Sequence, residues 1–180
     1  MIRRFSAALV ALALTGILAS GCSSVSTTRN AADTNGRHLT VAQYQLLLQG
    51  VAKSSDTFQI PPVDATGMPG TTARGILGQW VSNVIMSDAL VAKGVPVSAA
   101  DRKAAEDKIL SGNAATVWAG LSDELKSFVL DSQTLQPAFA AAFGADAQAT
   151  LITAAQSAKV SIDSRYGMWD SATGQVVATR

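Results

Sequence analysis

Apolar side chains recur every three to four residues along most of this chain, and that spacing predicts amphipathic α-helices. Capping residues mark where several of these patterns begin, because a Ser, Thr or Asp side chain can satisfy free backbone N–H groups of the first turn. The segment 55–72 is rich in proline and glycine and predicts a loop. The predicted helices run from Thr40 to Gly50 or Ser54, from Thr71 or Thr72 to Lys93, from Ser98 to Gly112, from Ser122 to Gly144, and from Asp146 past Ala155.

Near the C-terminus the apolar period changes from 3.6 to 2, because side chains in 160–163 alternate between apolar and polar. One strand is not stable alone, so this segment needs a partner. The other extended candidates are 31–34 and 37–39, on either side of the turn-forming pair Asn35-Gly36. We therefore predict a mainly α fold, a helical bundle closed by a small β-sheet that pairs the N-terminal and C-terminal strands of the mature chain.

The first residues have the pattern of an export signal. Arg3 and Arg4 precede an uncharged apolar run of about 14 residues, which is shorter than the roughly 20 residues that a membrane-spanning helix needs. The following "LASGC" resembles the lipobox of bacterial lipoproteins, so we expect 1–21 to be removed and Cys22 to carry fatty chains such as palmitate. A free thiol at Cys22 behind an ordinary signal peptide is the alternative. The arginine pair is also found in twin-arginine signals, but the next residues do not continue that motif.

Removal of the signal leaves 12 of the 14 basic side chains against 13 acidic ones. No basic run remains that would follow nucleic-acid phosphates, so we expect no nucleic-acid partner. Contact with the membrane is expected through the lipid on Cys22, which implies an extracytoplasmic protein anchored to a bacterial cell membrane. The small polar residues 22–33 predict a flexible tether.

Three segments are distinctive in this order around a mainly helical body: "TNGRHLTVAQY" at 34–44, "KGVPVSAAD" at 93–101 and "AKVSIDSRYGMWD" at 158–170. Together they resemble the N-terminal, chaperone-like domain of the SurA family of bacterial envelope foldases. The resemblance covers about 33–177 and implies a helical domain at 34–163, with its first and last strands paired. It leaves 164–180 as an aromatic tail with a possible small hairpin. Many relatives also carry a parvulin-type prolyl isomerase module, and we expect none here because the sequence ends 17 residues after Asp163.

Asp88 is the acidic residue whose position most needs a partner. It falls beside the apolar stripe of the longest predicted helix, where a carboxylate requires compensation. We predict an ion pair with Arg74, Lys93 or Arg102 rather than a catalytic role.

Aromatic residues are the other structural candidates. Trp80 lies on the stripe of the same helix, and Tyr166 and Trp169 flank a glycine in the tail. We expect the two tail rings to pack on the domain as a structural seal, with ligand stacking as the alternative. A turn at Thr173-Gly174 would return the chain as a second short strand.

The sequence contains no pattern that identifies a reaction. His38 is the single histidine, and without a second ligand or a partner nucleophile it forms neither a metal site nor a triad. The pairs Glu106-Asp107 and Asp123-Glu124 are adjacent in sequence, so on a helix their side chains diverge by about 100° and cannot share a proton. We expect no cofactor, no metal and no catalytic residue.

Two functions remain. The first is a membrane-anchored, non-catalytic chaperone-like domain that binds unfolded or exported proteins. The second is a structural or adaptor lipoprotein that docks one cell-envelope partner. An enzyme ranks third.

Overall fold

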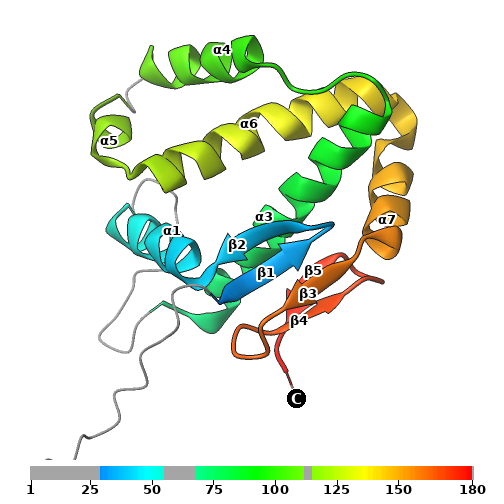
Figure 1. Ribbon diagram of the computed structural model, residues 1–180. Coiled ribbons are helices and arrows are strands. Elements are labelled where there is room, and N and C mark those ends of the chain that lie inside the picture. Colours follow the sequence, from blue (N-terminus) through cyan, green and yellow to red (C-terminus); the bar gives the residue numbers. More distant parts are fainter. Residues whose placement is uncertain (1–28, 55–67, 112–114, 180) are drawn as a thin grey trace, which may run out of the picture.

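The structure is a computed structural model that describes residues 29–54, 68–111 and 115–179 (Figure 1). The predicted signal peptide at 1–21, the lipidation candidate Cys22 and the tether up to residue 28 lie outside these residues. The prediction of a mainly helical protein with a small antiparallel sheet is confirmed. The helices are α1 (Val41–Lys53), α3 (Gly70–Ala92), α4 (Ala99–Leu110), α5 (Ala115–Gly120), α6 (Asp123–Phe143) and α7 (Ala147–Ser157), and a 3-10 turn (Gly144–Asp146) joins the last two.

Side-chain caps fix several of these boundaries. The Thr40 hydroxyl accepts a hydrogen bond from the backbone N–H of Gln43 at 3.2 Å, and the Gln43 side chain accepts one from the N–H of Thr40 at 3.0 Å. Ser98 and Asp101 form the same reciprocal box at the start of α4. Asp146, in contrast, makes no side-chain cap, because the 3-10 turn already brings the chain into the helical conformation at that point. Asp146 is the N-cap position of the last helix, as predicted, but its side chain does not cap the helix.

The strands are β1 (Asn30–Thr34), β2 (Arg37–Thr40), β3 (Val160–Ile162), β4 (Met168–Asp170) and β5 (Gln175–Val177). The first three form an antiparallel sheet in the order β2-β1-β3, and β4 pairs with β5 in a separate hairpin. Ala32 lies opposite Ile162, and Thr34 lies opposite Val160. Because β1 begins at Asn30, the range 22–33 predicted as a flexible tether is too long by at least four residues.

The turn between β1 and β2 also holds β3 in register. Asn35 and Gly36 have φ values of 52° and 82°, which suits the Asn-Gly pair at a tight hairpin. The backbone N–H of Asn35 donates to the carbonyl of Lys159 at 2.9 Å, and the N–H of Lys159 donates to the Asn35 side chain at 2.9 Å. The hydrogen bonds between β1 and β3 therefore continue into this turn.

The main core lies where α1, α3 and α6 meet the sheet. Tyr44, Leu77 and Leu125 are fully buried there, one from each helix. The Tyr44 hydroxyl donates to the carbonyl of Ala73 at 2.6 Å, which satisfies the one polar atom that this ring brings inside. Farther along, a second apolar cluster joins the two long helices α3 and α6. Its buried members are Met86, Leu90, Leu135 and Phe139.

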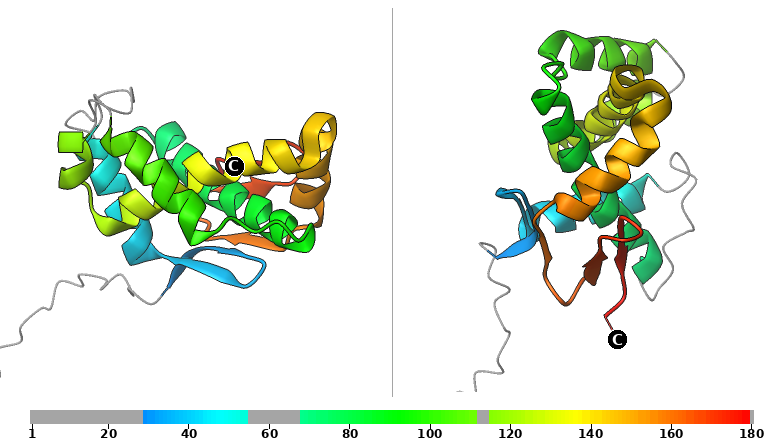
Figure 2. Two further views of the ribbon diagram at one scale, coloured as in Figure 1. Left: turned by 90° about the horizontal axis from the view of Figure 1, so that it is seen from above. Right: turned by 90° about the vertical axis from the view of Figure 1, so that its right-hand side faces the viewer.

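The elements lie at different distances from this core. In two views α4 lies on the side of α6 away from the sheet, while the β4–β5 hairpin lies beside β3 and the first half of α3 (Figure 2). No residue of α4 is buried. The helix is therefore held by contacts at its surface rather than by a buried stripe.

Candidate functional site

The aromatic candidates pack on the main core. The ring of Tyr166 meets Tyr44 edge to face, with centroids 5.0 Å apart. Trp80 and Trp169 are half-buried, and each contacts two apolar clusters of the protein. The indole N–H of Trp169 is buried and has no hydrogen-bond partner. The tail rings therefore lie against the domain through their apolar faces.

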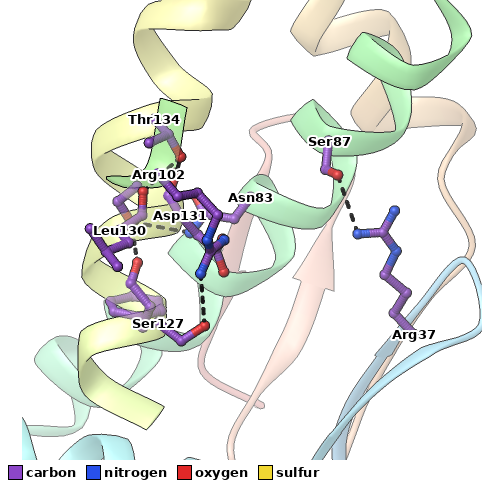
Figure 3. A network of polar contacts seen from close by, with 10 residues as sticks. Arg37, Asn83, Ser87, Arg102, Ser127, Leu130, Asp131 and Thr134 are labelled. Carbon is purple, nitrogen blue, oxygen red and sulfur yellow. Dashed lines mark hydrogen bonds and ion pairs between the residues drawn. The ribbon is translucent and has the colours of Figure 1, made fainter. Parts of the chain in front are cut away.

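Asp88 forms an ion pair, but with a different partner from those predicted. Its Oδ1 lies 2.5 Å from an Nη of Arg37, and its Oδ2 accepts a hydrogen bond from the Asn35 side chain at 2.8 Å. Arg37 also donates to Ser87 at 3.3 Å (Figure 3). The prediction of Arg74, Lys93 or Arg102 as partner is wrong, because the β1–β2 turn crosses α3 at this position and supplies the cation.

Asp163, which sequence analysis did not single out, is a carboxylate that joins the start of β1 to the end of β3. The side chain of Asp163 is 2% exposed and accepts contacts from Arg29 and Arg165, each at 2.9 Å from Oδ2. The hydrogen bonds from Arg165 hold the pKa of Asp163 below its usual value, against the opposing effect of burial. Asp163 therefore remains ionised at neutral pH and holds the residues before β1 against the end of β3.

A cleft lies between α4, α5 and α6. It has a volume of about 600 Å³ and is lined mainly by apolar side chains. Trp118 forms part of its wall, and its indole N–H donates to Glu106 of α4 at 3.1 Å. The lining residues are Ala104, Ala105, Lys108, Ile109, Val117, Trp118, Leu121, Val129, Gln133 and Pro137.

Polar contacts on one side of the cleft join α4 to α6. Arg102 of α4 forms an ion pair with Asp131 of α6 and donates to the Ser127 hydroxyl at 3.1 Å (Figure 3). Both members of the ion pair are about one-third exposed. Since α4 buries no side chain fully, these contacts and the Glu106–Trp118 bond set the width of the cleft.

The cleft contains few polar side chains. Its polar lining side chains are Lys108 and Gln133, and His38 lies elsewhere, 2.5 Å from Asp33 in the β1–β2 hairpin. Within the described ranges, no group of three or more His, Cys, Asp or Glu side chains has the arrangement of a metal site. The lining of the cleft is therefore suited to contact with apolar groups.

Comparisons with known proteins add no relative: no protein-family model, curated protein or solved structure matches this chain. No helix among the residues that the structure describes is long and apolar enough to cross a bilayer.

Sequence reasoning missed the cleft. The short helix α5 was not predicted, and it supplies Val117 and Trp118. The signals that could have found it are a tryptophan after a glycine-containing break and a proline, Pro137, within the next helical pattern.

Proposed function

We propose that this protein is an extracytoplasmic lipoprotein whose domain binds unfolded or exported polypeptides without catalysis, as a chaperone-like module related to the SurA N-terminal domain. The observation that carries the proposal is the apolar cleft between α4, α5 and α6. Its volume lies within the range of roughly 300–1,000 Å³ that is usual for ligand sites. Its lining favours the burial of apolar side chains, which folded proteins bury and unfolded ones expose.

The attachment of α4 supports a site that accepts different sequences. A helix without buried side chains can shift at a smaller cost in free energy than α3 or α6, which carry the core. The width of the cleft can then adjust to the side chains that enter it. Polypeptide binding with low sequence selectivity needs such a wall.

The anchor and the closed sheet belong to the same proposal. Lipid on Cys22 would hold the domain at a membrane surface, and intact mass spectrometry of the mature protein tests for the added fatty chains. The pairing of β1 with β3 supports closure of the helical domain by its two terminal strands. If closure holds, the amide protons of Ala32 and Val81 will exchange with solvent in one cooperative unfolding event.

The binding function is tested by filling the cleft. The domain 29–180 is mixed with a reduced, aggregating client protein, and light scattering is followed with and without the substitution Ala105→Trp, which places an indole in the cleft. Ala100→Trp is the matched control, because Ala100 is exposed on the same helix and does not line the cleft. We expect wild type and A100W to delay aggregation and A105W to lose this effect. Equal protection by A105W would overturn the proposal.

An adaptor that docks one envelope partner is the second candidate. The observation that favours it is the absence of methionine from the cleft lining, since binding surfaces with many partners often use flexible methionine side chains. Crosslinking in native membranes distinguishes the two candidates. A single partner at fixed stoichiometry supports the adaptor, and a mixture of exported proteins supports the chaperone-like function.

A further inference from the structure

Helix α6 contains a proline in its interior, at a position that faces the cleft. Pro137 lies between Asp123 and Phe143 in a helix that continues on both sides of it. Proline has no backbone N–H, so the usual hydrogen bond from residue 137 to the carbonyl of Gln133 cannot form. This carbonyl therefore lacks its regular helical donor.

The position of that carbonyl is set by the helical repeat. Val129, Gln133 and Pro137 are spaced four residues apart, so they form one stripe along α6, and all three line the cleft. The missing hydrogen bond lies on this stripe, between its second and third members. Among the described residues, no backbone N–H from outside the helices donates to the Gln133 carbonyl, and Gln133 and Pro137 are both exposed at the edge of the cleft.

A backbone acceptor in a cleft with mainly apolar walls distinguishes between ligand conformations. The backbone N–H groups inside a helix already donate to their own carbonyls, whereas an extended segment keeps every second N–H free on one side. The apolar walls above and below the acceptor would take the neighbouring side chains of the segment. An extended apolar polypeptide fits both features, and a helical one fits only the walls.

We propose that the Gln133 carbonyl is a recognition point of the cleft, which accepts a hydrogen bond from a backbone N–H of a bound extended polypeptide segment. This inference rests on the proposed polypeptide-binding function and names the conformation that the site recognises. Pro137 is then a positioning residue, because it acts by withholding the N–H that would otherwise occupy the carbonyl.

The test replaces the proline by a residue that restores the helical donor. Pro137→Ala should raise the melting temperature, because alanine is the better helix former, and should also weaken binding of a labelled nine-residue peptide of valine, leucine and serine. We expect the dissociation constant to rise about fivefold, the usual effect of one hydrogen bond exchanged with water. If Pro137 had only a structural role, a more stable variant would not be expected to bind the peptide less tightly.

N-methylated peptides identify the donor. Each methyl group removes one backbone N–H, and we expect one position at which methylation weakens binding to wild type but not to P137A. Gln136→Ala is the control, since Gln136 is exposed on the same helix and does not line the cleft, and its affinity for the unmodified peptide should stay within twofold of wild type. Circular dichroism verifies that each variant is folded.

The outcomes separate the two proposals. If wild type binds the peptide and A105W does not, but P137A binds as tightly as wild type, the carbonyl has no role and the binding function stands. Equal sensitivity of wild type and P137A to every methylation would show that the proline acts through cleft shape, which also overturns the inference. If wild type does not bind the peptide, both proposals fail.

Discussion

Gly167 is the position at which the structure predicts the largest effect of adding one carbon atom. Its φ of +135° lies in a region that only glycine adopts readily. A Cβ at this position would lie 2.4 Å from the carbonyl oxygen of Val177 and 2.9 Å from a methyl carbon of Val176. Both neighbours belong to β5, and the nearer contact is backbone, so it cannot be relieved by rotating a side chain. Gly167→Ala therefore requires β5 to move away from β4.

The magnitude follows from two contributions. The backbone conformation alone costs about 1–3 kcal/mol for a residue with a side chain. Movement of β5 also disturbs the burial of Val176, whose side chain is packed in the main core and is worth about 1–2 kcal/mol. We expect G167A to lower the free energy of unfolding by about 3 kcal/mol. For a domain of this size, that corresponds to a fall in melting temperature of about 10 °C.

The measurement is urea denaturation followed by tryptophan fluorescence, with thermal melting by circular dichroism as a second probe. Gly75→Ala is the matched control, because Gly75 lies within α3 and a Cβ there meets no atom within 4 Å. That variant should gain about 0.5–1 kcal/mol from helix propensity. If the free energy of unfolding of G167A lies within about 1 kcal/mol of the wild-type value, the reasoning from positive φ and close approach is refuted.

Substitutions at three further positions test two polar contacts and the packing of one tail ring. Arg102→Met should lower the free energy of unfolding by about 1 kcal/mol and raise hydrogen exchange in α4 more than in α3; unchanged exchange in α4 would show that the ion pair with Asp131 does not hold this helix. The folded-state pKa of Asp163 is depressed, so its stabilisation is present above the unfolded pKa of about 4 and is lost as the pH falls through the folded pKa. Asp163→Asn should accordingly be less stable than wild type at pH 7 and approach it below pH 4, and a difference independent of pH would contradict this. Trp169→Phe should change stability by less than about 1 kcal/mol because it removes a buried donor without a partner, whereas Trp169→Ala should cost about 2 kcal/mol or more, and equal effects would argue against packing as the role of the ring.

The parts of the fold that could be predicted depend on contacts within a few residues. The capping boxes at Thr40 and Ser98 join residues three apart, so the starts of α1 and α4 can be predicted from the local sequence. The turn at Asn35 and Gly36 is similarly local, because both residues tolerate positive φ. The mainly helical class with a small antiparallel sheet follows from these features together with the apolar period.

The parts that could not be predicted depend on how elements cross in space. Arg37 and Asp88 are 51 residues apart, and nothing in the apolar pattern of α3 shows that the β1–β2 turn passes over it. The cleft has the same origin, because its lining comes from three helices and the spacing between α4 and α6 is set by Arg102. The sequence shows that Pro137 removes a helical hydrogen bond, but only the structure shows that this position lines the cleft.

The position of the cleft relative to the proposed anchor bears on what can reach it. Cys22 precedes Arg29 by seven residues, and even a fully extended chain of that length spans at most about 25 Å. Arg29 is held at the sheet by Asp163, whereas α4 lies on the opposite side of α6 from the sheet (Figures 1 and 2). If Cys22 carries the proposed lipid, Arg29 and the adjoining sheet stay within about 25 Å of the bilayer, whereas the cleft is separated from this attachment point by α6. Under the proposed function, segments of polypeptide in the aqueous compartment would then reach the cleft more readily than lipid chains would.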